Sequence, residues 1–251
     1  MIECDKLCVR LGGKRIITDL SARFDDGAIT VILGKNGSGK TTILKALSGL
    51  YGYSGSVRVD GAELKKQKRT EISKKVSVLP QILPQPPVTV ATLVGFGRSP
   101  YTGFSGIMSP TDLNFVEQAI ATTGIETLRE KYVDKISGGE RRKAFFAMVL
   151  AQSSNNVLLD EPCANLDAEY IGTVSELIKR LKSENKAVIA VFHDINMAFE
   201  LADRLIFIEN GKCIFIGTPN EAVEKHIPEK VFSLTPYTLT DAQGNKSIFY
   251  K

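Results

Sequence analysis

The chain has 251 residues, of which 43% are hydrophobic and 24% charged, and its formal net charge at pH 7 is +4. This composition is that of an ordinary folded protein, long enough for one large α/β domain or for a core with a sizeable insertion. No stretch approaches the roughly 18 apolar residues of a membrane span, and the charged start MIECDKLCVRLGG has no apolar signal region. We therefore expect a cytosolic chain that does not itself cross a membrane.

The first 80 residues contain short apolar runs that are bounded by Gly, Asp or Pro. Such runs predict strands, here at 7–11, 28–34, 55–61 and 74–80. One helix is expected from Lys40 to Leu50. The basic cluster KKQKR at 65–69 has no interleaved aromatic residues that could stack on bases, so we interpret it as a solvated face and expect no nucleic-acid partner.

The middle of the chain changes from strand to helix patterns after the proline cluster PQILPQPP at 80–87. In the stretch 109–124, Ser109 or Thr111 can cap an amphipathic run, and helical patterns continue to about residue 152. This pattern predicts a helical subdomain, 81–152, inserted into the rest of the fold.

A β-α alternation returns after the helical insert. It predicts strands at 155–160 and 187–193, helices at 168–185 and 194–203, and hairpins at 204–217 and 238–250. The pair Asn210-Gly211 suits a type I′ turn in the first hairpin. Alternating strands and helices favour a parallel sheet. We therefore predict a single α/β domain, 1–251, whose core comprises 1–80 and 153–251.

The four cysteines do not form a metal or disulfide pattern. Cys4 and Cys8 are close in sequence, but no second pair or histidine accompanies them to complete a zinc site. We expect all four to be reduced thiols.

A phosphate-binding loop follows the predicted strand at 28–34. Gly34, Gly39, Lys40 and Thr41 fit G-x-x-x-x-G-K-[ST] at every fixed position, between a strand and a helix. In this motif the backbone amides surround the phosphates, the lysine bridges the β- and γ-phosphates, and the hydroxyl binds Mg²⁺. A glycine-rich turn that only joins strand to helix is the alternative.

Two carboxylates end the buried strand at 155–160, at the edge where parallel sheets bind ligands. Asp160 would hold Mg²⁺ through water, and Glu161 would polarise the attacking water. A charged strand end without function is the alternative, and the phosphate loop upstream argues against it.

Two further polar residues end predicted strands. His193 could be a structural histidine, but beside a nucleotide its imidazole could donate to the γ-phosphate. The Gln81 amide could reach both Mg²⁺ and the attacking water, at the hinge to the helical insert.

A second anion site is indicated by KISGGERRK at 135–143, where a Ser-Gly-Gly turn opens a helix whose free N–H groups can bind an anion. One small protein would then have two phosphate-binding sites.

Together these motifs resemble the ATPase subunit of an ATP-binding cassette transporter over the whole chain. The matching segments are GKNGSGKT, Gln81, ISGGE, VLLDEP, ANLD and His193, in the family's order. The resemblance implies a phosphate-loop NTPase core with a parallel sheet, an N-terminal antiparallel β part and an inserted helical subdomain. It also implies that ATP binds to Gly34, Lys35, Asn36, Gly37, Ser38, Gly39, Lys40, Thr41 and Thr42.

The resemblance also implies a dimer in which two cassettes pack head to tail. The signature residues Ser137, Gly138, Gly139 and Glu140 would then contact the ATP bound by the partner subunit. Asp167 would lie at the dimer interface. This arrangement explains why one chain carries two phosphate-binding sites.

The insert resembles importers of ferric siderophores, haem or cobalamin, through VTVATLVGFGRSPY at 88–101 and SGGERRKAFFAMVLAQ at 137–152. That resemblance implies a peripheral protein at the cytoplasmic face of the cell membrane, with permease subunits, a second copy of this chain and, indirectly, a substrate-binding protein as partners. A soluble ATPase of iron–sulfur cluster assembly also carries SGGE before basic residues, but LLDEP and GRSPY favour a transporter. A small-molecule kinase would leave the signature turn without a purpose.

Three residues depart from the family pattern. Leu11 stands where an aromatic ring usually stacks on adenine, so we expect weaker contact with the base. Glu140 replaces the commoner glutamine, and Cys163 replaces threonine. A carboxylate in the first helical turn is electrostatically favourable.

Overall fold

The computed structural model describes residues 1–103, 106–164, 168–240 and 246–251. One ten-stranded sheet has the order β5-β4-β1-β2-β10-β9-β3-β8-β7-β6, and β11 and β12 form a separate two-stranded sheet. The strands are β1 (Ile2–Leu11), β2 (Lys14–Phe24), β3 (Ile29–Leu33), β4 (Ser54–Val59), β5 (Ala62–Glu63), β6 (Val76–Leu79), β7 (Asn156–Asp160), β8 (Ala187–Val191), β9 (Arg204–Glu209), β10 (Lys212–Gly217), β11 (Pro236–Thr240) and β12 (Lys246–Tyr250).

The parallel part of the sheet consists of β9, β3, β8, β7 and β6. Every residue of β3, β7 and β8 is buried, as expected for parallel strands that are covered on both faces. Because these strands run in the same direction, the residues that follow them gather at one edge of the sheet. This edge carries the candidate site.

The antiparallel part contains a strand, β2, that the sequence patterns did not predict. Its buried residues Ile17, Leu20 and Phe24 are three and four positions apart, a spacing that does not alternate as a regular strand does. The β1–β2 pairing has register shifts after Cys4, Leu7 and Val9, and these irregularities explain the spacing.

The first 80 residues contain two α-helices, where the sequence predicted one. Helix α1 (Lys40–Leu47) ends three residues before the predicted Leu50, and α2 (Arg69–Lys75) was missed because a short polar helix has little apolar periodicity. The KKQKR cluster lies in the 3₁₀ helix Leu64–Lys66 and the start of α2, and its basic residues are exposed, as predicted.

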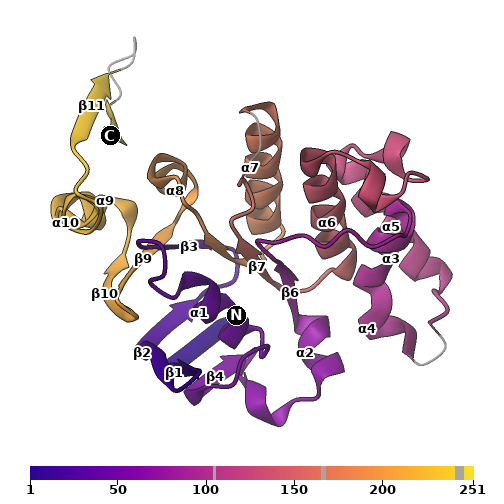
Figure 1. Ribbon diagram of the computed structural model, residues 1–251, viewed down its shortest axis with the longest axis horizontal. Helices are drawn as coiled ribbons and strands as arrows, with labels where there is room; N and C mark the ends of the chain where they lie inside the picture. The colour runs from indigo at the N-terminus through magenta and orange to yellow at the C-terminus, as the bar shows by residue number, and fades with distance from the viewer. Residues whose placement is uncertain (104–105, 165–167, 241–245) are drawn as a thin grey trace.

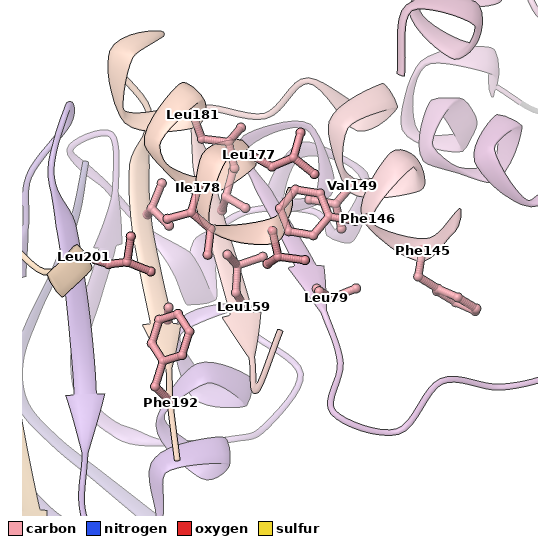
Figure 2. Packing of buried hydrophobic residues seen from close by; sticks show 14 of the residues in the cluster. Leu79, Phe145, Phe146, Val149, Leu159, Leu177, Ile178, Leu181, Phe192 and Leu201 are labelled. Carbon is pink, nitrogen blue, oxygen red and sulfur yellow. The ribbon is translucent and has the colours of Figure 1, made fainter. Parts of the chain in front are cut away.

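The helical part of the fold forms the right-hand side of Figure 1. It contains α3 (Val90–Gly95), α4 (Ser99–Thr102), α5 (Pro110–Thr123), α6 (Gly138–Gln152) and the 3₁₀ helices Phe96–Arg98, Glu126–Leu128 and Val133–Lys135. Of the two candidate caps, Ser109 caps α5: its hydroxyl accepts from the Asp112 amide. Figure 2 shows side chains of α6 and α7 (Ala168–Ser183) gathered with Leu159 of β7, so the helical part packs on the parallel sheet.

The C-terminal elements are α8 (Ile195–Leu201), the β9–β10 hairpin, α9 (Pro219–Glu224), α10 (Ile227–Phe232) and the β11–β12 hairpin. Asn210 and Gly211 have φ values of 47° and 75°, which confirms the predicted type I′ geometry. Asn196 of α8 holds the terminal hairpin: its amide nitrogen donates to the Tyr250 carbonyl (3.2 Å), and its oxygen accepts from the Tyr250 amide (2.8 Å).

The predicted fold class is confirmed: an α/β core with a parallel sheet carries an antiparallel β part and inserted helices. Cys4, Cys8, Cys163 and Cys213 are all free, as predicted. Within the described ranges, none of the helices combines the length and the apolar character that crossing a membrane requires.

Candidate functional site

The phosphate loop turns sharply between β3 and α1. Gly34 has φ 157°, and a Cβ there would lie 2.2 Å from the carbonyl oxygen of Ile208. Gly39, with φ 105°, would place a Cβ 2.5 Å from the Cδ1 of Ile17. Only glycine fits these two positions, so the fixed glycines of the motif are required by the packing of the loop as well as by its backbone angles.

The phosphate loop contains two buried polar side chains, Ser38 and Lys40. The hydroxyl of Ser38 is buried and has no hydrogen-bond partner in the described part of the chain. The Lys40 ammonium donates to the carbonyls of Gly34 (2.7 Å) and Lys35 (3.1 Å). Burial lowers the pKa of Lys40, and the carboxylates of Glu161 and Asp160 oppose this shift. An unpartnered hydroxyl and a buried cation fit an anionic ligand.

The start of α1 contacts the end of β7. The Thr41 hydroxyl donates to the Asp160 carboxylate at 3.1 Å. Burial raises the pKa of Asp160, and the bond from Thr41 acts in the opposite direction. Thr41 and Gln81 line one cavity, and the Asp160 carboxylate lies beside the Thr41 hydroxyl. The hydroxyl, amide and carboxylate groups of these residues supply hard oxygen atoms that suit Mg²⁺.

Glu161 has a left-handed backbone, with φ 51°. Its amide donates to the Val191 carbonyl at the end of β8 (3.0 Å), and its own carbonyl accepts from the Ala164 amide (3.2 Å). A non-glycine residue in this conformation is disfavoured unless its surroundings hold it, and such residues occur preferentially at functional sites. This conformation places Glu161 on the wall of the cavity described next.

A cavity of about 400 Å³ joins residues of the phosphate loop with Gln81, Glu161 and His193. Gln81 and His193 each lie two residues beyond the end of a strand, β6 and β8, rather than in the strand itself. Both are exposed and line the cavity. The cavity is lined by Ile16, Asn36, Gly37, Gly39, Lys40, Thr41, Thr42, Gln81, Glu161 and His193.

Ile16 was not predicted from the sequence, in which Leu11 occupies the position expected to contact the base. Ile16 is half-buried in β2 and lines the cavity beside the phosphate loop. Leu11 ends β1, pairs with Lys14 across the hairpin and is 36% exposed. Recognising the β1–β2 hairpin in the sequence would have placed Ile16 near the phosphate loop, but its second strand was not predicted.

A second cavity of about 500 Å³ adjoins the loop and shares Asn36 and His193 with the first. Lys35, Asn36 and His193 lie on its wall together with Asn196 and Tyr250. Tyr250 of the C-terminal hairpin therefore shares a cavity with His193, which the sequence assigns to the γ-phosphate.

The signature residues lie apart from this cavity, at the N-terminus of α6. The Ser137 hydroxyl accepts from the Glu140 amide (3.2 Å), and the Glu140 carboxylate accepts from the Ser137 amide (2.8 Å). Hydrogen bonds from the Ser137 backbone and side chain lower the pKa of the Glu140 carboxyl. Gly138 has open space around its Cα, so this helix end is accessible. Asp167, the predicted interface residue, lies outside the described residues.

Cys163 follows the acidic strand and is half-buried. Burial raises the pKa of its thiol to about 12. The thiol is therefore protonated at neutral pH, which disfavours the oxidation that proceeds through a thiolate.

Comparison with known sequences places these features in a family. A family profile described as ABC transporter matches residues 17–164, more than half of the chain. The petrobactin import ATP-binding protein YclP of Bacillus subtilis (strain 168) is 35% identical over 238 residues, which cover 94% of each chain. The ferric enterobactin transport ATP-binding protein FepC of Escherichia coli (strain K12) is 34% identical over 94% of this chain and 89% of its own. The hemin import ATP-binding protein HmuV of Mesorhizobium japonicum is 32% identical over 92% and 91%.

Solved structures share the fold. A dimeric ATP-binding cassette, MJ0796, in a post-hydrolysis state bound to ADP and Pi, has a TM-score of 0.77 at 22% identity and covers 87% of this chain and 99% of its own. CbiO1 of Clostridium perfringens, part of an ABC transporter complex, has a TM-score of 0.76 at 24% identity and covers 92% and 93%. At these identities the comparison shows the fold alone.

Proposed function

The chain belongs to the ATP-binding cassette (ABC) transporter family, as an ATPase, and we propose that it drives the import of an iron chelate such as a siderophore, or of haem or a cobalamin-type substrate, through a membrane permease. The observation that carries this proposal is the 400 Å³ cavity, where the phosphate loop, Glu161 and His193 meet, with Asp160 bonded to Thr41 of its wall. The relatives described above are named for petrobactin, enterobactin and hemin transport, which supports this substrate class.

The cavity residues suit hydrolysis of a nucleoside triphosphate. Lys40, now bonded to loop carbonyls, would exchange one of them for phosphate oxygens. Glu161 would orient and polarise the attacking water, and His193 would donate a hydrogen bond to the γ-phosphate. The loop amides and the N-terminus of α1 would receive the remaining phosphate charge.

Thr41, Gln81 and Asp160 are proposed to hold Mg²⁺ with the nucleotide. Their hydroxyl, amide and carboxylate oxygens come from α1 and from the segments after β6 and at the end of β7. The Thr41–Asp160 hydrogen bond brings two of these groups together. Bound Mg²⁺ would neutralise charge on the phosphate oxygens during transfer.

We propose a head-to-tail homodimer as the working unit. Ser137, Gly138, Gly139 and Glu140 open α6 away from the cavity, at an accessible helix N-terminus. An N-terminus of this kind stabilises an anion, and a partner subunit can bring its nucleotide there. Asp167 is proposed to lie in the same interface.

The helices of residues 81–152 are proposed as the subdomain that moves the permease when the dimer closes and opens, with 1–80 and 153–251 as the core. The chain would act as a peripheral protein at the cytoplasmic face of the membrane. A substrate-binding protein would be an indirect partner, through the permease. This division assigns hydrolysis to the core and coupling to the insert.

The test is made on the protein in its own cell membranes. A tagged chain should co-purify with a permease from detergent-solubilised membranes, and uptake of radiolabelled ferric siderophore should be lost in Lys40→Ala. Co-purification with a soluble scaffold instead, with siderophore and haem uptake intact in Lys40→Ala, would favour iron–sulfur cluster assembly and contradict the importer.

A further inference from the structure

A buried arginine of the signature helix bonds to both catalytic segments. Arg142 donates from Nη1 to the Glu161 carbonyl at 2.7 Å and from Nη2 to the Gln81 carbonyl at 3.3 Å. Glu161 follows β7, and Gln81 lies just beyond β6. One guanidinium therefore connects three segments: the start of α6 and the ends of two strands.

The contacts of Arg142 are unusual for a buried cation. The residue is 7% exposed, and burial lowers its pKa. Among the described residues it forms no ion pair with a carboxylate, and its bonds go to backbone carbonyls. Burying a charge without a counter-ion is costly. The position of Arg142 is therefore better explained by the two carbonyls that its planar guanidinium bonds than by a contribution to stability alone.

The bond to Glu161 acts on a strained residue. The Glu161 backbone is left-handed, and its carbonyl receives Arg142 in addition to the Ala164 amide. Removing one of these donors lets the peptide unit after Glu161 rotate more freely. Since that rotation moves the side chain proposed to orient water, the bond bears on catalysis.

Arg142 sits on a rigid part of α6. The helix begins at Gly138 of the signature turn, four residues before Arg142, and its next turns carry Phe146 and Val149. Figure 2 shows both side chains in the cluster that includes Leu79 of β6 and Leu159 of β7. A displacement of the signature turn is therefore transmitted along a packed helix to the Arg142 fork.

We propose that Arg142 is a positioning residue that fixes the Glu161 and Gln81 backbones relative to the signature helix, so that docking of the signature on a nucleotide sets the catalytic geometry. This inference rests on the proposed ATP hydrolysis. The guanidinium fork is the required feature, because it bonds two carbonyls at once.

The first test measures steady-state ATP hydrolysis of the full chain. Arg142→Gln and Arg142→Lys should lower kcat about 10- to 100-fold, while KM for ATP and the dissociation constant of a fluorescent nucleotide change less than about threefold, because the phosphate loop is intact. Wild-type kcat in either variant would overturn the proposal.

The matched control is Arg98→Gln. Arg98 is a second buried arginine of the helical part, ion-paired to Asp112 at 2.8 Å and bonded to the Ala151 carbonyl at 2.9 Å. Within the described ranges it has no hydrogen bond to the segments that follow β6 and β7. Its variant should lower the melting temperature but keep the kcat of the folded protein. An equal loss of kcat in Arg98→Gln and Arg142→Gln would show a structural role and overturn the proposal.

Amide hydrogen exchange supplies a readout that does not depend on hydrolysis. In Arg142→Gln, the amide of Ala164 should exchange about tenfold faster, while amides in β3 exchange as in wild type. Unchanged exchange at Ala164, or faster exchange throughout the chain, would overturn the inference. If the wild-type chain does not hydrolyse ATP, and Arg142→Gln still loses protection at Ala164, the proposed function is contradicted. The structural role of Arg142 is then supported.

Discussion

Thr41 donates a hydrogen bond of 3.1 Å to Asp160, although the two residues are 119 positions apart in sequence. The bond joins the first turn of α1 to the end of β7, so the phosphate loop and the acidic strand meet in the folded chain. This contact gives the proposed Mg²⁺ site a preorganised pair of oxygen atoms.

Asp160→Asn should weaken the Mg²⁺ dependence of hydrolysis. A carboxylate that acts through water on the ion contributes about 10- to 100-fold in metal affinity, and the amide removes its charge. We expect the Mg²⁺ concentration for half-maximal activity to rise by that factor, measured at saturating ATP, while ATP still binds without the metal. An unchanged Mg²⁺ titration would show that Asp160 takes no part in holding the ion.

Glu161→Gln should retain ATP and Mg²⁺ binding and lose turnover. Loss of a general acid-base group costs roughly 10² to 10⁴ in rate, and the amide cannot polarise water as the carboxylate does. Size-exclusion chromatography with ATP should then show a trapped dimer. Hydrolysis close to that of wild type would contradict the role assigned to Glu161.

Leu11→Tyr should tighten ATP binding by about 0.5 to 1.5 kcal/mol, the additional value of an aromatic contact. Ile16→Ala provides the counterpart: loss of apolar contact in the cavity should weaken binding by about 1 kcal/mol. Both are measured by titration with a fluorescent nucleotide. No change in Leu11→Tyr, with a loss in Ile16→Ala, would assign the base contact to Ile16.

Two inactive variants should restore activity when they are mixed. Lys40→Ala breaks the phosphate loop, and Ser137→Arg blocks the signature turn, so each homodimer should be nearly inactive. A mixed dimer has one complete site, in which the loop of the Ser137→Arg chain faces the signature of the Lys40→Ala chain. Recovery of hydrolysis on mixing is the expected result of sites shared between subunits.

A fused dimer provides the control for the mixing experiment, since some cassettes need both sites. With both substitutions on one half, sites shared between subunits are both broken, whereas sites within one subunit leave one intact. Half of the wild-type activity in this fusion, with none in the fusion that splits the substitutions between halves, would rule out the shared site.

Glu140 should make the signature helix sensitive to acid. Hydrogen bonds from Ser137 hold the pKa of Glu140 below the reference value of 4.5. A lowered folded-state pKa stabilises the fold above the unfolded-state value, and that contribution disappears as the pH falls through the folded-state pKa. The difference in melting temperature between wild type and Glu140→Gln should therefore shrink when the pH falls below about 4.5. A difference that is constant with pH would show that the carboxylate does not carry the effect.

The sequence predicted those parts of the site that depend on neighbouring residues. The phosphate loop has glycine at Gly34 and Gly39, whose φ values of 157° and 105° belong to the sharp turn of the loop itself. The capping pair Ser137 and Glu140 is three residues apart, and the Asn210-Gly211 turn is formed by adjacent residues. Local sterics and hydrogen bonding fix such features wherever they occur in a chain.

Only the tertiary structure decided the features that depend on distant pairing. Strand β2 is bulged against β1, so its buried residues lack a period of two, and Ile16 reaches the cavity through that pairing. Arg142 bonds to carbonyls 19 and 61 positions away, and backbone carbonyls carry no signature in the side-chain sequence. The residues of the motifs could be identified from their order in the sequence. The connection between the signature helix and the catalytic segments depends on the packing of α6 on the sheet. A buried cation such as Arg142 is bonded only where the fold brings backbone oxygens together.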